Sequence, residues 1–291
     1  MGYLMMDNPI YKSLKGWCEM PTKKQHYIPR MLLKRFSAVN NSGKKIKIYR
    51  YDKNKKNQQL VSIDDICLEN YLYEIRDETG KISDKEINLI ENGFSRLESV
   101  WDKIIDNVEQ GRDITQKDRC MLGILLVLQL IRTPEIMKFT SDWLLDTSMN
   151  IEKPLTKNEA DRCMKLASFV WGNVKPETNW ILNILLEKFL VGKDVIIYHS
   201  NSDFILNGSR PVLCLKFFET SNIDNCTWLL PIAKNYCIGL GNEGTMLYRN
   251  IDKSFTQFIN AHNFQNEGRF IYGSESIMNR IKNDNCIKKR I

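Results

Sequence analysis

The sequence predicts an α+β fold, with a helical N-terminal and central part and a small antiparallel sheet contributed mainly by the C-terminal third. Between about residues 83 and 190, apolar residues recur every three or four positions, as in helices packed on a core. Between about residues 194 and 273, short apolar runs separated by Asn, Ser, Gly and Pro indicate strands and turns. We therefore expect one domain over residues 23–283, preceded by an extension (1–22) and followed by a basic tail (284–291).

Residues 25–36 (QHYIPRMLLKRF) are expected to contain the first helix. Pro29 suits a first helical turn, because the N–H that proline lacks would have no partner there. The apolar residues that mark the buried face of this helix are Ile28, Leu32, Leu33 and Phe36. His26 and Arg30 should therefore lie near a helix start, beside the core.

Residues 45–51 (KIKIYRY) alternate basic and apolar side chains, which predicts a half-buried strand. Ser83 and Glu86 have the spacing of a capping box and predict the start of a long helix. Its apolar stripe consists of Ile87, Ile90, Phe94, Leu97, Trp101, Ile104 and Val108. Glu91 and Glu98 lie on the flank of this stripe, so both are expected to face inward.

Thr115 and Asp118 form a weaker capping signal for the next helix. This helix should be the central buried one, because residues 121–128 hold hardly a polar atom. Gln129 and Arg132 follow, three residues apart and so on one face. Residues 133–135 (TPE) have an N-cap threonine, a first-turn proline and a first-turn acid, which predicts a helix break at Arg132.

Later segments follow the same two patterns. Further helices are predicted at 158–171, 176–190, 255–264 and 274–282. Strands are predicted at 195–198, 204–206, 212–218, 226–230, 236–240 and 270–272.

The formal net charge of +7 and the pI of about 8.9 favour a polyanionic partner such as nucleic acid. Part of this charge lies in two lysine-rich patches, at residues 44–56 and 282–290. A solvated hairpin and a frayed tail are the alternative interpretation of these patches.

The eight cysteines form no C-x-x-C pair, so no zinc-binding framework is visible, and several fall in apolar runs typical of buried thiols in a reducing cytoplasm. No stretch reaches the roughly 18 to 20 apolar residues that a membrane span needs. We therefore expect a soluble, cytoplasmic protein with no membrane partner. A divalent metal ion is the one cofactor left open.

Sequence signatures of P-loop nucleotide hydrolases, dinucleotide-binding folds, serine hydrolases and zinc proteases are absent. His199 and His262 show no metal-ligand spacing with each other or with a cysteine. Separated histidine, glutamate and arginine residues remain as candidates for chemistry.

Several motifs occur together and in order along the chain. They are His26 to Pro29 with Phe36, Glu91 with Glu98, Gln129 with Arg132 to Pro134, Asp203 to Ile205 with Arg210 to Val212, Pro231 with Ile232, and Asn260 with Arg269 to Gly273. This set resembles the bacterial family filed as domain of unknown function 4238, over roughly residues 24–273. The resemblance implies an architecture and candidate positions, but no established reaction.

One motif departs from the family pattern. The family's turn usually reads Ser/Thr-Asp-x-Pro, whereas the turn before Pro211 here is Asn207-Gly208-Ser209-Arg210. If that aspartate is catalytic or metal-binding in relatives, this protein has moved the function or lost it.

His26 is the candidate general acid or base, because histidine titrates near neutrality and a neighbouring carboxylate can hold it. Glu98 or Glu91 would orient it or bind a metal, and Gln129 is a further candidate catalytic residue. The alternatives are a histidine bonded to a neighbouring carbonyl and a core amide bonded to the backbone.

Arg30 and Arg132 are candidates for holding a phosphate, since a guanidinium can bind two oxygens at once. For Arg132, a buried ion pair with one of the glutamates is an equal alternative. Asn207, Ser209 and Arg210 could bind an anion through the turn's backbone N–H groups, with a plain hairpin turn as the alternative. If carboxylates neutralise all the arginines, the anion site disappears.

These residues lead to three hypotheses. The first is a phosphodiester hydrolase, nuclease-like and acting on RNA or DNA in a bacterial toxin or phage-defence setting. The second is a sensor or binding module for an anionic ligand or a partner protein, without catalysis. The third assigns the polar cluster a purely structural role.

Overall fold

The computed structural model describes residues 20–37, 45–149, 152–169, 180–216, 226–242 and 247–283. Most of the predicted N-terminal extension, the basic tail and the start of the helix predicted at 176–190 lie outside the described residues.

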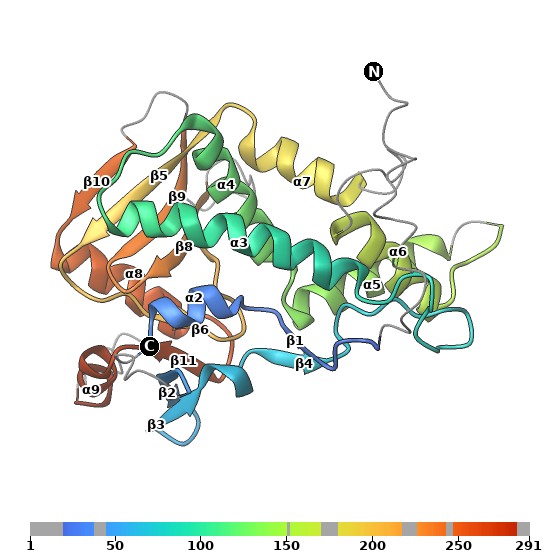
Figure 1. The fold of residues 1–291 in the computed structure, drawn as a ribbon, viewed down its shortest axis with the longest axis horizontal. Helices are drawn as coiled ribbons and strands as arrows, with labels where there is room; N and C mark the ends of the chain where they lie inside the picture. Colours follow the sequence, from blue (N-terminus) through green and yellow to red (C-terminus); the bar gives the residue numbers. More distant parts are fainter. Residues whose placement is uncertain are drawn as a thin grey trace.

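The described chain alternates helical and extended segments (Figure 1). The helices are α2 (Arg30–Arg35), α3 (Leu89–Glu109), α4 (Gln116–Ile131), α5 (Pro134–Ser148), α6 (Lys157–Phe169), α7 (Trp180–Leu190), α8 (Lys253–Gln265) and α9 (Glu275–Asn283). The strands are β1 (Lys24–His26), β2 (Lys47–Asp52), β3 (Asn57–Ser62), β4 (Leu68–Asn70), β5 (Lys193–Ser200), β6 (Leu206–Asn207), β7 (Leu213–Lys216), β8 (Cys226–Ala233), β9 (Tyr236–Asn242), β10 (Tyr248–Ile251) and β11 (Phe270–Gly273), with a short 3-10 helix, η1 (Ile63–Asp65).

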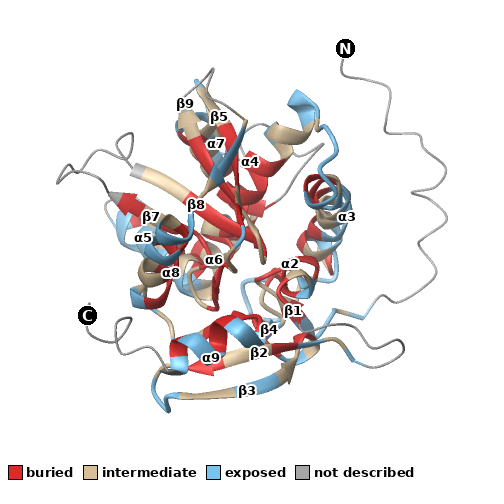
Figure 2. Cartoon of the chain, turned by 90° about the vertical axis from the view of Figure 1, so that its left-hand side faces the viewer, coloured by how far each residue is buried: buried red, intermediate tan, exposed pale blue. Residues whose placement is uncertain are grey.

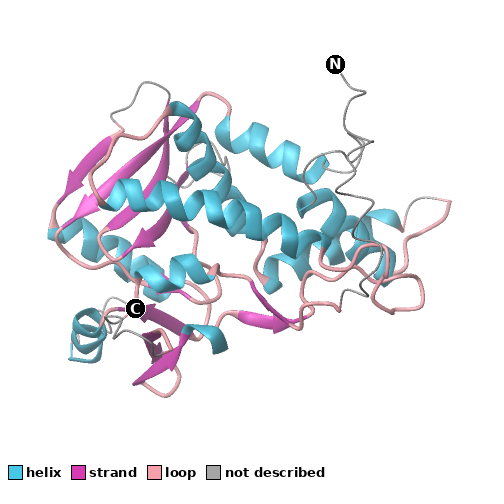
Figure 3. Cartoon of the chain, viewed as in Figure 1, coloured by secondary structure: helices cyan, strands magenta, loops and turns pink. Residues whose placement is uncertain are grey.

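These strands form three separate sheets (Figure 3). The largest has the order β10-β5-β9-β8-β7, and its β10 runs parallel to β5 whereas the other pairs are antiparallel. The second has the order β3-β2-β11-β6, and β1 pairs with β4 in the third. Extended segments from both ends of the described chain therefore meet in the second sheet.

The α+β mixture is observed, but the predicted sheet layout is wrong. Strands β2 and β3 come from the N-terminal part of the chain and share a sheet with β11 and β6, in which β2 pairs with β11. Neither β10 nor its parallel pairing was predicted. Local periodicity indicates whether a segment is extended, but not which distant strand satisfies its hydrogen bonds. Whether the described elements make one domain stays a prediction.

Helix α4 forms the centre of the molecule, as its apolar sequence predicted. Its N-terminus has the capping box predicted at Thr115 and Asp118, with each side chain bonded to the other residue's main-chain N–H. Gly123 lets α4 approach α7 and β5, because a Cβ there would lie 2.8 Å from Leu190 and 3.3 Å from Val195. Figure 2 shows α4 mostly buried, whereas α3 has both a buried and an exposed side.

Helix α3 starts later than predicted. It begins at Leu89, after an Asn88 with φ of 55°, rather than at Ser83. The main-chain N–H of Ser83 donates to the carbonyl of Ile75, and Glu86 binds Arg162, so neither residue is available to cap a helix. Tertiary contacts therefore override the local capping signal.

Within the described residues, no single helix is long and apolar enough to cross a membrane, and α4 with α5 meets the criterion only as a pair bent by 72°.

Candidate functional site

Arg132 lies at the C-terminal end of α4 with its side chain 1% exposed. Its Nη1 donates to Glu98 Oε1 at 3.0 Å, its Nε to the Tyr73 hydroxyl at 3.0 Å, and its Nη2 to the carbonyl of His26 at 2.8 Å. The guanidinium also lies 4.0 Å from the centre of the Phe94 ring. Each guanidinium nitrogen therefore has a protein acceptor, which favours the ion-pair interpretation over phosphate binding.

His26 contributes its main-chain carbonyl, not its ring, to this cluster. Its Nε2 lies 3.1 Å from the carbonyl oxygen of Ile63 and donates to it when the ring is neutral. Burial lowers the pKa of His26, and the charges of Arg30 and Arg132 lower it further, against the Ile63 carbonyl and Asp64. Burial thus favours the neutral ring, and the Ile63 carbonyl fixes its position in place of the predicted partner, Glu91 or Glu98.

Glu91 is half-buried on α3, the helix that also supplies Glu98 to the Arg132 cluster. Burial raises its pKa to about 7, with Glu98 and Glu74 acting in the same direction and Arg132 opposing them. Because Arg132 bonds Glu98 instead, its charge offsets only part of the upward shift in the pKa of Glu91.

We expect Glu91→Gln to change how stability depends on pH. The folded state holds the Glu91 proton up to about pH 7, whereas the unfolded chain loses it near 4.5, so wild-type stability falls as pH rises between these values. The free energy of unfolding of the variant does not fall in this way. The difference between variant and wild type should therefore grow from about pH 4.5 and level off above pH 7, at about 1–2 kcal/mol after solvent screening. Urea unfolding from pH 4 to 8 measures it.

Asn92→Ala is the matched control, because Asn92 is an exposed, non-titrating position of the same helix. Its effect on stability should be equal at every pH. A Glu91→Gln profile parallel to the wild-type profile would contradict the assignment.

The other arginines singled out in the sequence also have carboxylate partners. Arg30 binds Asp64 at the surface, and Arg210 binds Glu135 at 3.4 Å and also contacts Glu267. The partners of Arg35 are Asp102, Asp106 and Glu109. The surplus of positive charge required for the predicted anion site is therefore not present around these residues.

The turn before Pro211 is held together by Asn207. Its Oδ1 accepts the main-chain N–H groups of Ser209 and Arg210, both at 2.9 Å, and its Nδ2 donates to two carbonyls at 3.0 Å. The N–H groups that were candidates for binding an anion are thus used within the turn. The alternative interpretation, a plain turn, therefore accounts for the presence of Asn207 and Ser209.

Gln129 and Arg210 line a cavity of about 450 Å³. It lies between the α4–α5 junction, the chain following Arg210, strands β7 and β8, and the end of α8. Leu130, Ile136, Val212 and Leu213 supply apolar walls. Thr133 and Trp228 also line it, so residues far apart in the sequence converge here.

Three buried polar atoms of this lining have no hydrogen-bond partner within the described part of the chain: Gln129 Oε1, Thr133 Oγ1 and Trp228 Nε1. Gln129 is fully buried, and its Nε2 donates to the carbonyl of Tyr27 at 2.8 Å, which fixes the orientation of the amide. Thr133 is 1% exposed, and its hydroxyl does not cap α5. An unpaired buried polar atom is costly, so three of them on residues of one lining make the cavity a candidate site.

Residues 24–276, well over half of the chain, match the family described as a protein of unknown function (DUF4238). The chain belongs to the DUF4238 family. No curated protein and no solved structure matches it. Gln129, Thr133 and the Arg210–Pro211–Val212 segment, on which the resemblance to DUF4238 rested, all line the cavity.

His262 also lines the cavity of this DUF4238 protein. It was not among the candidate residues predicted from the sequence, because it shows no metal-ligand spacing. Its Nδ1 lies 2.9 Å from the carbonyl oxygen of Phe258, one turn earlier in α8, and the two rings lie 4.2 Å apart. With Nδ1 donating, Nε2 is the ring nitrogen that can accept a hydrogen bond. The four-residue spacing predicts the contact between Phe258 and His262 within α8. Nothing in the sequence shows that this face of α8 lies against the cavity formed by α4.

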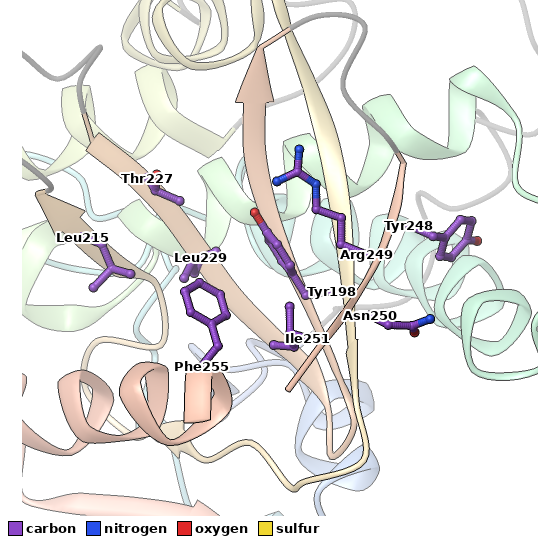
Figure 4. Close-up of a pocket in the computed structure, with 9 residues that line it drawn as sticks. All are labelled: Tyr198, Leu215, Thr227, Leu229, Tyr248, Arg249, Asn250, Ile251 and Phe255. Carbon is purple, nitrogen blue, oxygen red and sulfur yellow. The ribbon is translucent and has the colours of Figure 1, made fainter. Parts of the chain in front are cut away.

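A second cavity, of about 680 Å³, lies on the other face of the five-stranded sheet (Figure 4). Thr227 and Leu229 point toward it, whereas Trp228 between them lines the first cavity, as strand alternation requires. Tyr198 and Arg249, partners in register on β5 and β10, also line it. None of the site residues predicted from the sequence lines it.

Among the described residues of this DUF4238 protein, no group of three or more His, Cys, Asp or Glu side chains is placed to hold a metal ion. The divalent metal considered from the sequence therefore has no donor set there.

Proposed function

We propose that this DUF4238 protein binds a small molecule in the cavity between the α4–α5 junction and the five-stranded sheet. The observation that carries the proposal is that one cavity is lined by three residues, Gln129, Thr133 and Trp228, that each hold an unpaired buried polar atom. Leaving a buried donor or acceptor unsatisfied costs about 1–3 kcal/mol, and a bound ligand would remove that cost. The proposal keeps the binding-module hypothesis but no longer requires an anionic ligand.

The Arg132 cluster acts in this proposal as the support of the cavity wall. Arg132 holds the carbonyl of His26, and Gln129, one turn earlier in α4, holds the next carbonyl, that of Tyr27. The same short segment therefore fixes both the end of α4 and the amide that lines the cavity. The polar cluster is then structural, and its function is to orient Gln129.

The proposal is tested by screening a fragment library against protein whose tryptophan indole N–H groups are observed by NMR. The chain has 6 tryptophans, and Trp228→Phe identifies the signal of Trp228. We expect some fragments to shift this signal, and Gln129→Met and Thr133→Val to weaken their binding by at least about tenfold, because each removes a polar partner.

Thr227→Val is the matched control, since Thr227 lines the cavity on the opposite sheet face. It should leave fragment binding unchanged. A library without any fragment that shifts the Trp228 signal, or equal effects of the two threonine variants, would contradict the proposal.

The hydrolase hypothesis remains as a second candidate, now with His262 as the acid or base instead of His26. The supporting observation is that His262 lines the cavity and that the carbonyl of Phe258 anchors its Nδ1, so Nε2 is the acceptor nitrogen of the neutral ring. The nuclease activity and the toxin or phage-defence setting are parts of this candidate. A cytoplasmic location is also a proposal, supported by free cysteines at 67, 120, 163 and 237.

This candidate predicts that His262→Ala abolishes cleavage of labelled RNA or DNA, whereas His26→Ala retains it. Each protein is incubated with substrate alone, with Mg²⁺ and with Mn²⁺, and the products are separated by electrophoresis. Absence of cleavage by the wild type in all conditions would eliminate the hydrolase and leave the binding function standing.

A further inference from the structure

We infer that the ligand of the Gln129 cavity is a neutral ring with an amide edge, that is, a ring N–H beside a ring carbonyl, as in a pyrimidinedione. This inference rests on the proposed small-molecule binding and specifies the ligand class. It follows from the hydrogen-bonding capacity of the cavity's unpaired atoms and from the charge of its walls.

Gln129 Oε1 can only accept a hydrogen bond, so the ligand must bring a donor to it. The amide cannot simply rotate to present its nitrogen, because Nε2 would then lose the Tyr27 carbonyl at 2.8 Å. Trp228 Nε1 can only donate, so the ligand must also bring an acceptor. The Thr133 hydroxyl can do either and accommodates whichever group lies next to it.

A ligand that satisfies all three groups therefore carries both a donor and an acceptor. A carboxylate or phosphate offers acceptors only and would set an anionic oxygen against Gln129 Oε1. A hydrocarbon would leave all three groups buried and unpaired. An amide edge supplies N–H and C=O together.

The remaining walls favour an uncharged, partly apolar ring. Leu130, Ile136, Val212 and Leu213 supply apolar walls, and no aspartate or glutamate of the described residues lines the cavity. Arg210 and His262 line it too. Glu135 and Glu267 balance the charge of Arg210, and Nδ1 of the neutral His262 ring is bound by the carbonyl of Phe258. The volume of about 450 Å³ falls within the range of roughly 300–1,000 Å³ typical of small-molecule sites.

The test uses uracil and 1,3-dimethyluracil as matched ligands, because methylation removes both ring N–H groups and keeps the ring and its carbonyls. Benzoate and toluene represent anionic and apolar ligands of similar size. Each is titrated into the full chain while the Trp228 indole signal is followed. We expect uracil to bind at least about tenfold more tightly than the other three, since a site built around hydrogen bonds rejects analogues that lack them.

The same titrations are repeated with Gln129→Met, which keeps the side-chain length and removes the acceptor. The preference for uracil over 1,3-dimethyluracil should disappear, whereas Thr227→Val should retain it. A merely structural effect of the Gln129 substitution would weaken both ligands equally and leave the preference intact, which would overturn the inference.

Two further outcomes separate the inference from the proposal on which it rests. If benzoate or toluene shifts the Trp228 signal and uracil does not, the ligand class is wrong and small-molecule binding stands. If none of these probes and no library fragment shifts it, the cavity holds water only, and both fail.

Discussion

Replacing Arg132 by methionine is expected to lower the free energy of unfolding by about 3–5 kcal/mol, the largest effect of any polar substitution considered for this chain. The substitution leaves the carboxylate of Glu98, whose side chain is 24% exposed, without its partner. It also removes the donors to the Tyr73 hydroxyl and to the carbonyl of His26, in the buried interior. Equilibrium unfolding in urea measures the loss.

Arg30→Met is the matched control, because Arg30 has a 58% exposed side chain and pairs with Asp64 at the surface. Its cost should stay below about 1 kcal/mol. Adding Glu98→Gln to the Arg132 variant should recover part of the loss, since the buried charge is then removed. Equal costs for the two arginine variants would show that the Arg132 cluster does not hold the core.

The second large effect is expected for Gly268→Ala, at about 2–4 kcal/mol. Gly268 has φ of 113°, a conformation that residues with a side chain rarely adopt. An added Cβ would also lie 2.7 Å from Ser209 Cβ and 2.9 Å from Asn207 Oδ1, the atom that holds the turn before Pro211. Backbone strain and steric overlap therefore add, and urea unfolding measures their sum.

Gly111→Ala separates the two contributions. Gly111 also has a positive φ, 65°, but no atom lies within 4 Å of its added Cβ. Its cost should be about 1 kcal/mol, from the backbone alone. A Gly268 variant no less stable than the Gly111 variant would mean that the turn tolerates displacement, and Arg210 at the cavity would then move with it.

Local signals in the sequence located several elements correctly. The capping box at Thr115 and the proline break after Arg132 were both predictable, because each depends on residues within one turn. The start of α3 was misplaced, because Glu86, the acidic partner of Ser83 in the predicted capping box, binds Arg162 in α6. Strand partners were not predictable, since β2 pairs with a strand near the other end of the chain.

In the candidate site, too, some contacts were predictable from the sequence and others were not. The ion pair between Arg132 and a glutamate of the long helix was one of the alternatives, because an arginine beside an apolar helix needs a partner. The partner of the His26 ring was not predictable, since it is the carbonyl of Ile63, a group that every residue possesses. The approach of Trp228 and His262 to Gln129 depends on how the sheet packs on α4, for which the sequence holds no local signal.

The pairing of β2 with β11 has a consequence for folding during synthesis. Phe270 and Ile271 lie opposite Asp52 and Tyr51, about 220 residues earlier in the chain. At roughly 5–20 residues per second, the ribosome needs roughly 10–45 s to supply that strand. In the interval the β2–β3 hairpin exposes the backbone edge that β11 later covers, and such an edge can pair with another nascent copy. The fraction of chains that fold correctly is thus coupled to how many copies are being made nearby.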